Sequence, residues 1–183
     1  MTRVIFATEE QVTARIDELA DEIIRDFRGE KPLFIALLRG AAPFAAQLMF
    51  AIARKAPDFH PEIDYMMVST YGSGQKAGEP SIVTDVAPTT TVSGRQVIIL
   101  DDVLDKGITA HFVASHLRAR GASDIRLAVL ADKKTKKLRD ITADYCGFEV
   151  EDKWLVGMGM DDAGSGKEHN RWLGSIEAIG SVG

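Results

Sequence analysis

The sequence predicts an α/β fold in which helices flank a central parallel sheet. Three short runs are largely apolar, a composition typical of strands whose two faces are both covered, as in a parallel sheet. These runs are Leu33–Leu38, Val97–Leu100 and Ile125–Ala131. Segments with apolar residues at helical spacing separate them, and alternation of this kind is typical of right-handed βαβ crossovers.

The first expected helix begins at a capping box and ends at a glycine. Thr8 and Gln11 have the residue types and spacing of that box, and Gly29 follows the last residue of the periodic pattern. The apolar residues between them lie at helical spacing and are Val12, Ile16, Leu19, Ile23, Ile24 and Phe27. We expect this face to pack against the sheet.

The remaining elements alternate in type until Tyr145. In order they are a strand at 33–38, an alanine-rich helix at 42–54, strands at 63–68 and 96–101, a helix at 109–120 and a strand at 125–131. After Tyr145 the pattern changes to short strands and glycine-rich loops, which indicates a small subdomain. We therefore expect a single domain over residues 1–183.

Composition excludes several classes of function. The 183 residues, 45% of them hydrophobic, are enough to bury a full core. A net charge of −5 argues against a nucleic-acid surface, and the single cysteine, Cys146, fits a reducing compartment. We expect no signal peptide before the first helix, and no apolar run in the sequence approaches membrane-spanning length. We expect a cytoplasmic protein with no nucleic-acid or membrane partner.

Acidic residues and a glycine follow the strand at 96–101. They are Asp101, Asp102, Asp105 and Gly107, and Thr109 then opens a helix. Ligands of open α/β sheets gather at such strand ends, where carboxylates suit ribose hydroxyls or a divalent cation. Backbone amides near the glycine suit a phosphate at the helix N-terminus. The alternative is an ordinary strand, turn and helix cap, but the combination of residues favours a site.

This segment closely resembles the signature with which type I phosphoribosyltransferases bind phosphoribosyl pyrophosphate (PRPP). The resemblance implies that Asp101 and Asp102 hold the ribose hydroxyls and associated magnesium. It also implies a phosphate-binding loop made of Asp105, Lys106, Gly107, Ile108 and Thr109. Lys106 stands where the family usually has Thr or Ser, so a hydroxyl contact to the phosphate is lost and a charge is added.

The pair Arg39–Gly40 follows the strand at 33–38 and matches the family's pyrophosphate-binding loop. Alone, the pair reads as an ordinary strand-to-helix turn. The purine members of the family often have a non-proline cis peptide before the basic residue, which the resemblance places between Leu38 and Arg39.

A glycine-rich stretch after the strand at 63–68 matches a mobile loop of the same family. Without the resemblance it reads as a long hairpin connection. The matching residues are Ser69, Thr70, Tyr71 and Gly72. In the family this loop closes over the reacting centre and excludes water.

The basic run Asp132–Arg139 follows the strand at 125–131. Most such runs are solvated faces, and the acidic composition speaks against a nucleic-acid role. In the purine members a lysine at this point binds the 6-oxo group of the base, a role that the resemblance gives to Lys133. Lys134 stands where the family often has proline.

The segment Asp144–Asp161 is a second strong match. It implies that Trp154 stacks on the purine, that the Leu155 backbone reads the base edge, and that Asp161 binds magnesium with pyrophosphate. Without the resemblance, Trp154 would be taken for a core residue.

The stretch that follows departs from the family. Arg171 is a candidate for binding pyrophosphate, although it lies further from Asp161 than the family's arginine does. Asp162 is an additional acid, either a further metal ligand or a solvated side chain.

The resemblance covers nearly the whole chain, roughly Leu33–Ile179, and points to the hypoxanthine and hypoxanthine-guanine members of the family. It implies transfer from PRPP to a 6-oxopurine, with Mg²⁺ as cofactor and Asp105 as general base or partner of the purine N7 proton. It further implies a hood formed by the N-terminal segment and about 145–183, and a homodimer or homotetramer. A xanthine-preferring enzyme and a non-catalytic PRPP-sensing regulator remain as alternatives.

Overall fold

A six-stranded sheet forms the centre of the computed structural model, which describes residues 2–69, 80–162 and 168–180. Its strands are β2 (Leu33–Leu38), β3 (Glu62–Ser69), β4 (Ser81–Thr84), β5 (Gln96–Leu104), β6 (Asp124–Lys133) and β7 (Tyr145–Val150). Their order across the sheet is β4-β3-β2-β5-β6-β7. The strands β3, β2, β5 and β6 are parallel, as expected, β7 continues the parallel sheet beside β6, and β4 is an antiparallel edge strand beside β3.

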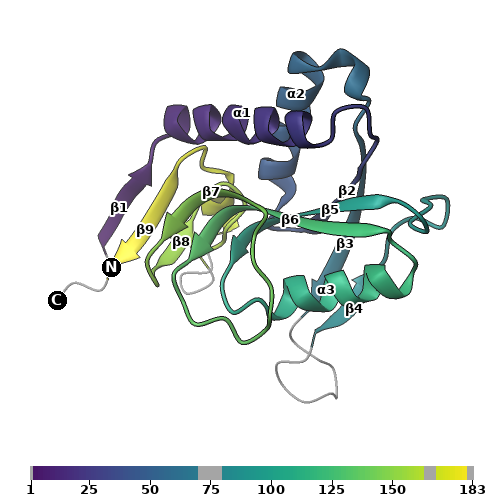
Figure 1. The fold of residues 1–183 in the computed structure, drawn as a ribbon. Coiled ribbons are helices and arrows are strands. Elements are labelled where there is room, and N and C mark those ends of the chain that lie inside the picture. The colour runs from purple at the N-terminus through teal and green to yellow at the C-terminus, as the bar shows by residue number, and fades with distance from the viewer. Residues whose placement is uncertain (1, 70–79, 163–167, 181–183) are drawn as a thin grey trace.

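Helices cover both faces of this sheet (Figure 1). The helices α1 (Glu9–Asp26) and α2 (Ala42–Lys55) share one hydrophobic core with the sheet, and α3 (Ile108–Ala119) forms a second core on the opposite face. Two short 3₁₀ helices complete the set, η1 (Pro57–Phe59) and η2 (Glu168–Trp172). Within the described ranges, no helix is long and apolar enough to span a membrane.

The capping box expected at the first helix is present. The Thr8 amide donates to Gln11 Oε1 (2.9 Å), and the Gln11 amide donates to Thr8 Oγ1 (3.3 Å). The apolar face of α1 is buried against the sheet. Arg15 extends from the same helix to β7, where it donates to the carbonyl oxygens of Cys146 and Gly147.

A separate three-stranded antiparallel sheet forms the hood. It consists of β1 (Thr2–Ala7), β9 (Ile176–Gly180) and β8 (Trp154–Val156), in the order β1-β9-β8. Residues 145–150, which were expected in the hood, instead form β7 of the main sheet. The reason is close packing, because a Cβ on Gly147 would overlap the carbonyl oxygen of Leu130 in β6. That glycine allows a close strand approach and does not mark a loop.

The parallel strands β2, β5 and β6 bring their carboxyl ends to the same edge of the sheet. Arg39 follows β2, Asp101 and Asp102 lie near the end of β5, and Lys133 is the last residue of β6. The topology therefore gathers residues that are far apart in the sequence at one edge.

Candidate active site

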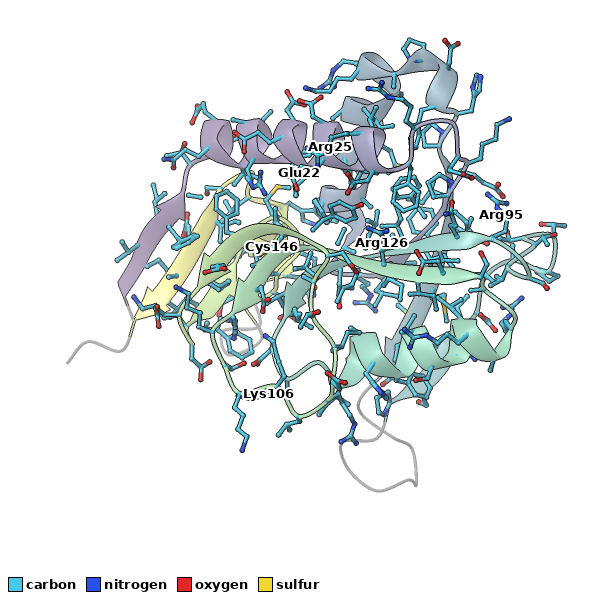
Figure 2. All side chains as sticks on the ribbon, in the orientation of Figure 1. Glu22, Arg25, Arg95, Lys106, Arg126 and Cys146 are labelled. Carbon is cyan, nitrogen blue, oxygen red and sulfur yellow. The ribbon has the colours of Figure 1, made fainter. Side chains whose placement is uncertain are left out.

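The loop from β5 into α3 forms the first part of the site, on the side of the molecule opposite α1, where Lys106 is labelled in Figure 2. A cavity of about 370 Å³ is lined by Asp101 and by residues 103–110. Gly107 precedes α3 with a positive φ of 75°, a conformation that favours glycine. It supplies no capping side chain, so the first amides of α3 are suited to an anion.

Asp101 and Asp102 lie side by side where the apolar part of β5 ends. The Asp102 amide donates to Asp101 Oδ1 (3.0 Å), and the Val103 amide donates to Asp102 Oδ1 (2.9 Å). Burial raises the pKa of Asp101 well above its usual value, and the neighbouring Asp102 charge raises it further. Burial also raises the pKa of Asp102. Two carboxyl groups this close resist carrying two negative charges, so the pair favours a bound cation or hydroxyl donors.

The loop after β2 packs directly against these acids. The peptide bond between Leu38 and Arg39 is cis, which confirms the sequence prediction. A Cβ on Gly40 would overlap the Asp102 carboxylate, and a Cβ on Gly159 would overlap the Gly40 carbonyl oxygen. Glycine at both positions therefore allows the loop, the acids and the hood to meet. Arg39 itself is exposed.

A second cavity, of about 180 Å³, lies between the ends of β5 and β6 and the hood. Its lining residues are Asp102, Val103, Asp105, Lys133, Trp154, Leu155, Met160 and Asp161. The Lys133 side chain is only 12% exposed, and its Nζ lies 3.8 Å from Asp105 Oδ2 and 6.0 Å from the centroid of the Trp154 ring. A cationic donor, a carboxylate and an aromatic ring therefore border one small space. This arrangement suits a flat heterocycle that carries a hydrogen-bond acceptor.

Trp154 is 48% exposed and is not a core residue. Its indole N–H donates to the Asp161 carbonyl oxygen (2.9 Å), which fixes the ring at the edge of the cavity. Leu155, the next residue, is buried.

Asp105 belongs to both cavities. Lys106 Nζ lies 3.7 Å from its Oδ1, and Lys133 Nζ approaches Oδ2 from the side of the smaller cavity. A ligand that extends from the phosphate-binding loop to the aromatic cavity therefore has to pass this carboxylate.

Arg171 connects the hood to the same region. It is largely buried, and its Nη2 donates to Asp161 Oδ2 (3.1 Å) while its Nε donates to Glu168 Oε2 (3.0 Å). It also donates to the Gly159 carbonyl oxygen. Arg171 thus meets Asp161 in spite of the longer spacing between them. Asp162 accepts a hydrogen bond from the buried Asn170 (3.1 Å), which connects it to η2.

The residues that match the family's mobile loop are described only in part. Ser69 is the last residue of β3, whereas Thr70, Tyr71 and Gly72 lie outside the described residues.

The carboxylates of the site fit a magnesium ion that arrives with a phosphate-bearing substrate. In the described part of the chain, no three His, Cys, Asp or Glu side chains form a group arranged to hold a metal. Asp102 and Asp161 nevertheless border the same cavity. Mg²⁺ in enzymes usually takes one or two carboxylates and completes its octahedron with water and substrate phosphate.

Sequence reasoning missed two residues of this region, Thr135 and Lys137. The Thr135 hydroxyl contacts Asp105, and the Lys137 ammonium group contacts the ends of β5 and β6. Both belong to the basic run after β6, and nothing in the sequence of that run distinguishes them from its exposed lysines.

Comparison with protein families identifies the fold and its relatives. A phosphoribosyl transferase domain model matches residues 6–163. The hypoxanthine-guanine phosphoribosyltransferase of Streptococcus thermophilus is 37% identical over 160 residues, which cover 87% of this chain and 84% of the relative. The Bacillus subtilis protein of the same name is 36% identical over 160 residues, with 87% and 85% covered.

Solved structures agree with the sequence matches. The crystal structure of a hypoxanthine-guanine phosphoribosyltransferase from Bacillus anthracis superimposes with a TM-score of 0.82 at 32% sequence identity, covering 96% of this chain and 97% of that one. The fold and the family assignment therefore rest on both sequence and structure.

Proposed function

Because this chain belongs to the phosphoribosyltransferase family, we propose that it transfers the 5-phosphoribosyl group of PRPP to the 6-oxopurine hypoxanthine, and also to guanine. The products are IMP or GMP and pyrophosphate, so the reaction serves purine salvage. The observation that carries the proposal is the meeting of two cavities at Asp105. One offers helix amides to a phosphate, and the other offers a lysine and a tryptophan to a flat base.

PRPP occupies the larger cavity in this proposal. The loop from Asp105 to Thr109 binds its 5′-phosphate, and the carboxyl groups of Asp101 and Asp102 accept hydrogen bonds from its ribose hydroxyls. The pyrophosphate lies by Arg39, Gly40 and Arg171. Departure of pyrophosphate leaves developing positive charge on the ribose, as in the cleavage of a glycoside, and these cationic side chains stabilise the departing group.

The purine occupies the smaller cavity. The 6-oxo group and N7 of a purine lie on one edge of the ring system, and Lys133 Nζ and Asp105 Oδ2 lie 3.8 Å apart. Lys133 donates to the oxygen while Asp105 accepts the N7 proton or fixes its position. Trp154 stacks on the ring, and the Leu155 backbone contacts the opposite edge.

Asp161, Asp101 and Asp102 are the residues that would hold Mg²⁺ in this proposal, Asp161 directly and the other two directly or through water. A magnesium ion bound there offsets negative charge on the pyrophosphate. Arg171 keeps one oxygen of the Asp161 carboxylate occupied and thereby orients the other.

Two alternatives are distinguished by specific residues. A non-catalytic PRPP-sensing regulator has no need for a purine cavity, yet Lys133 and Trp154 border one here beside Asp105. A xanthine-preferring enzyme shares the mechanism and differs only in contacts at the purine 2-position. Adenine is disfavoured because its 6-amino group and the Lys133 ammonium are both donors.

A spectrophotometric assay with PRPP and Mg²⁺ tests the proposal on hypoxanthine, guanine, xanthine and adenine in parallel. We expect turnover of hypoxanthine and guanine and none of adenine. Activity on xanthine alone would retain the reaction and change the substrate. PRPP binding without turnover of any base would establish the regulator instead.

We also propose, as the family resemblance implies, a cytoplasmic homodimer or homotetramer. Light scattering of the purified protein measures the number of subunits directly.

A further inference from the structure

The chain leaves β6 as a strap, residues 133–138, whose side chains alternate between inward and outward positions. Lys133 and Lys137 are 12% and 21% exposed, whereas Lys134 and Leu138 are 53% and 55% exposed. Lys136 is likewise exposed. The sequence of the strap suggests a basic surface, but in the structure every second side chain of the strap points toward the candidate site.

The strap contacts three consecutive residues, Leu104 at the end of β5 and Asp105 and Lys106 at the start of the phosphate-binding loop. Lys137 Nζ donates to the Leu104 carbonyl oxygen (3.1 Å), Thr135 Oγ1 lies 3.0 Å from Asp105 Oδ1, and the Leu138 amide donates to the Lys106 carbonyl oxygen (2.9 Å). Contacts on successive residues restrict that loop segment more than one contact could.

The Thr135 hydroxyl has two possible acceptors, both on Asp105. They are Oδ1, at 3.0 Å, and the main-chain carbonyl oxygen, at 3.1 Å. A hydroxyl donating to Oδ1 fixes the rotation of the carboxylate and leaves Oδ2 facing Lys133 and the smaller cavity. Thr135 thus contacts the Asp105 carboxylate on the side away from the smaller cavity, where the purine is proposed to bind.

Lys137 fixes the strap itself. Its Nζ lies 2.5 Å from Asp132 Oδ1, 2.8 Å from the Lys133 carbonyl oxygen and 3.1 Å from the Leu104 carbonyl oxygen. An ammonium group has three protons, and these three oxygens accept all of them. They belong to the adjacent ends of β5 and β6, so Lys137 joins the two strand ends that carry Asp105 and Lys133.

We propose that Thr135 is a positioning residue that sets the orientation of the Asp105 carboxylate, and that Lys137 holds the strap from which Thr135 acts. The inference rests on the proposed function, since it assigns these residues to the transfer reaction. It goes beyond that function because neither residue lines either of the two cavities.

Matched substitutions separate positioning from simple folding support. Thr135→Val keeps the shape and removes the donor, and Thr135→Ser keeps the donor. We expect the valine variant to lower kcat about tenfold or more, as befits a lost hydrogen bond to a charged group, with little change in KM for PRPP. The serine variant should stay near wild type.

A double-mutant cycle shows whether Thr135 acts through Asp105. Once Asp105 is replaced by Asn, the valine substitution should lower kcat by a much smaller factor than in the wild type. An equal loss in both backgrounds would overturn the proposal, as would wild-type kcat in Thr135→Val.

The strap contact is tested with a charge-matched control. Lys137→Met should lower kcat while Lys136→Met, which removes the same charge from an exposed position, should not. Equal effects of the two substitutions would show that only charge matters and would remove Lys137 from the proposal.

Crystal structures of Thr135→Val and Thr135→Ser test the positioning role of Thr135 independently of activity. If the wild type transfers no phosphoribosyl group, the proposed function is refuted, and these structures still show whether Thr135 orients Asp105. Positioning predicts that the Asp105 carboxylate rotates in the valine variant and stays in place in the serine variant. An unchanged carboxylate in both variants would refute the positioning role.

Discussion

Replacing Asp105 with Asn is expected to lower kcat for hypoxanthine by about a hundred- to ten-thousandfold, the range typical of a positioned general base. Asparagine keeps the size of the side chain and still accepts a hydrogen bond from Thr135, so the geometry around it survives. The asparagine side chain, however, can neither accept the purine N7 proton nor offset the positive charge associated with that proton. KM for PRPP should change little, because in the proposed function PRPP is bound by Asp101, Asp102 and the amides of the phosphate-binding loop.

Steady-state kinetics with each substrate varied in turn measures both quantities. Asp58→Asn, at an exposed position in η1, is the control for loss of a carboxylate elsewhere. Equal losses in kcat and in PRPP affinity would show that Asp105 binds substrate and does not act as the base.

Replacing Lys133 with Met is expected to raise KM for the purine about 10- to 100-fold, the effect of losing one hydrogen bond from a charged donor. Methionine retains much of the apolar stem, so the small cavity keeps its shape. The expected fall in kcat is smaller, because Asp105 and the PRPP site remain. Purine KM is read from initial rates at saturating PRPP.

The exposed Lys136→Met variant provides the baseline for this substitution. If Lys133→Met has the same KM for the purine as the wild type, Lys133 does not bind the purine. The smaller cavity would then lack the donor proposed to recognise the 6-oxo group.

Local patterns were sufficient to predict four strands of the main sheet, β2, β3, β5 and β6, and the helices that cover it. Continuous apolar runs are characteristic of buried parallel strands, and the Thr8–Gln11 box marks the start of α1. The hood boundary was wrong because residues 145–150 were grouped with the short strands and glycine-rich loops that follow them, whereas Gly147 allows a close approach to Leu130 that only the folded sheet reveals. The antiparallel edge strand β4 was also not foreseen.

The site was predicted where motifs lie at strand ends, and missed where contacts depend on the fold. Asp101, Asp102 and Asp105 follow one apolar strand, and Lys133 ends another, so topology alone brings them together. The cis peptide before Arg39 was predicted from family resemblance, since no pattern in the residues requires it. Thr135 and Lys137 act over about thirty residues of sequence, on Asp105 and Leu104 respectively, and nothing in a basic run marks them.

The most direct test of the central claim, that two cavities meeting at Asp105 form one active site, is a crystal structure of the protein with IMP. We expect the 5′-phosphate to lie at the amides of residues 106–109 and the purine to stack against Trp154. The 6-oxo group should accept a hydrogen bond from Lys133, and N7 should face Asp105. A nucleotide bound elsewhere, or bound with its base outside the cavity of Lys133 and Trp154, would contradict this claim.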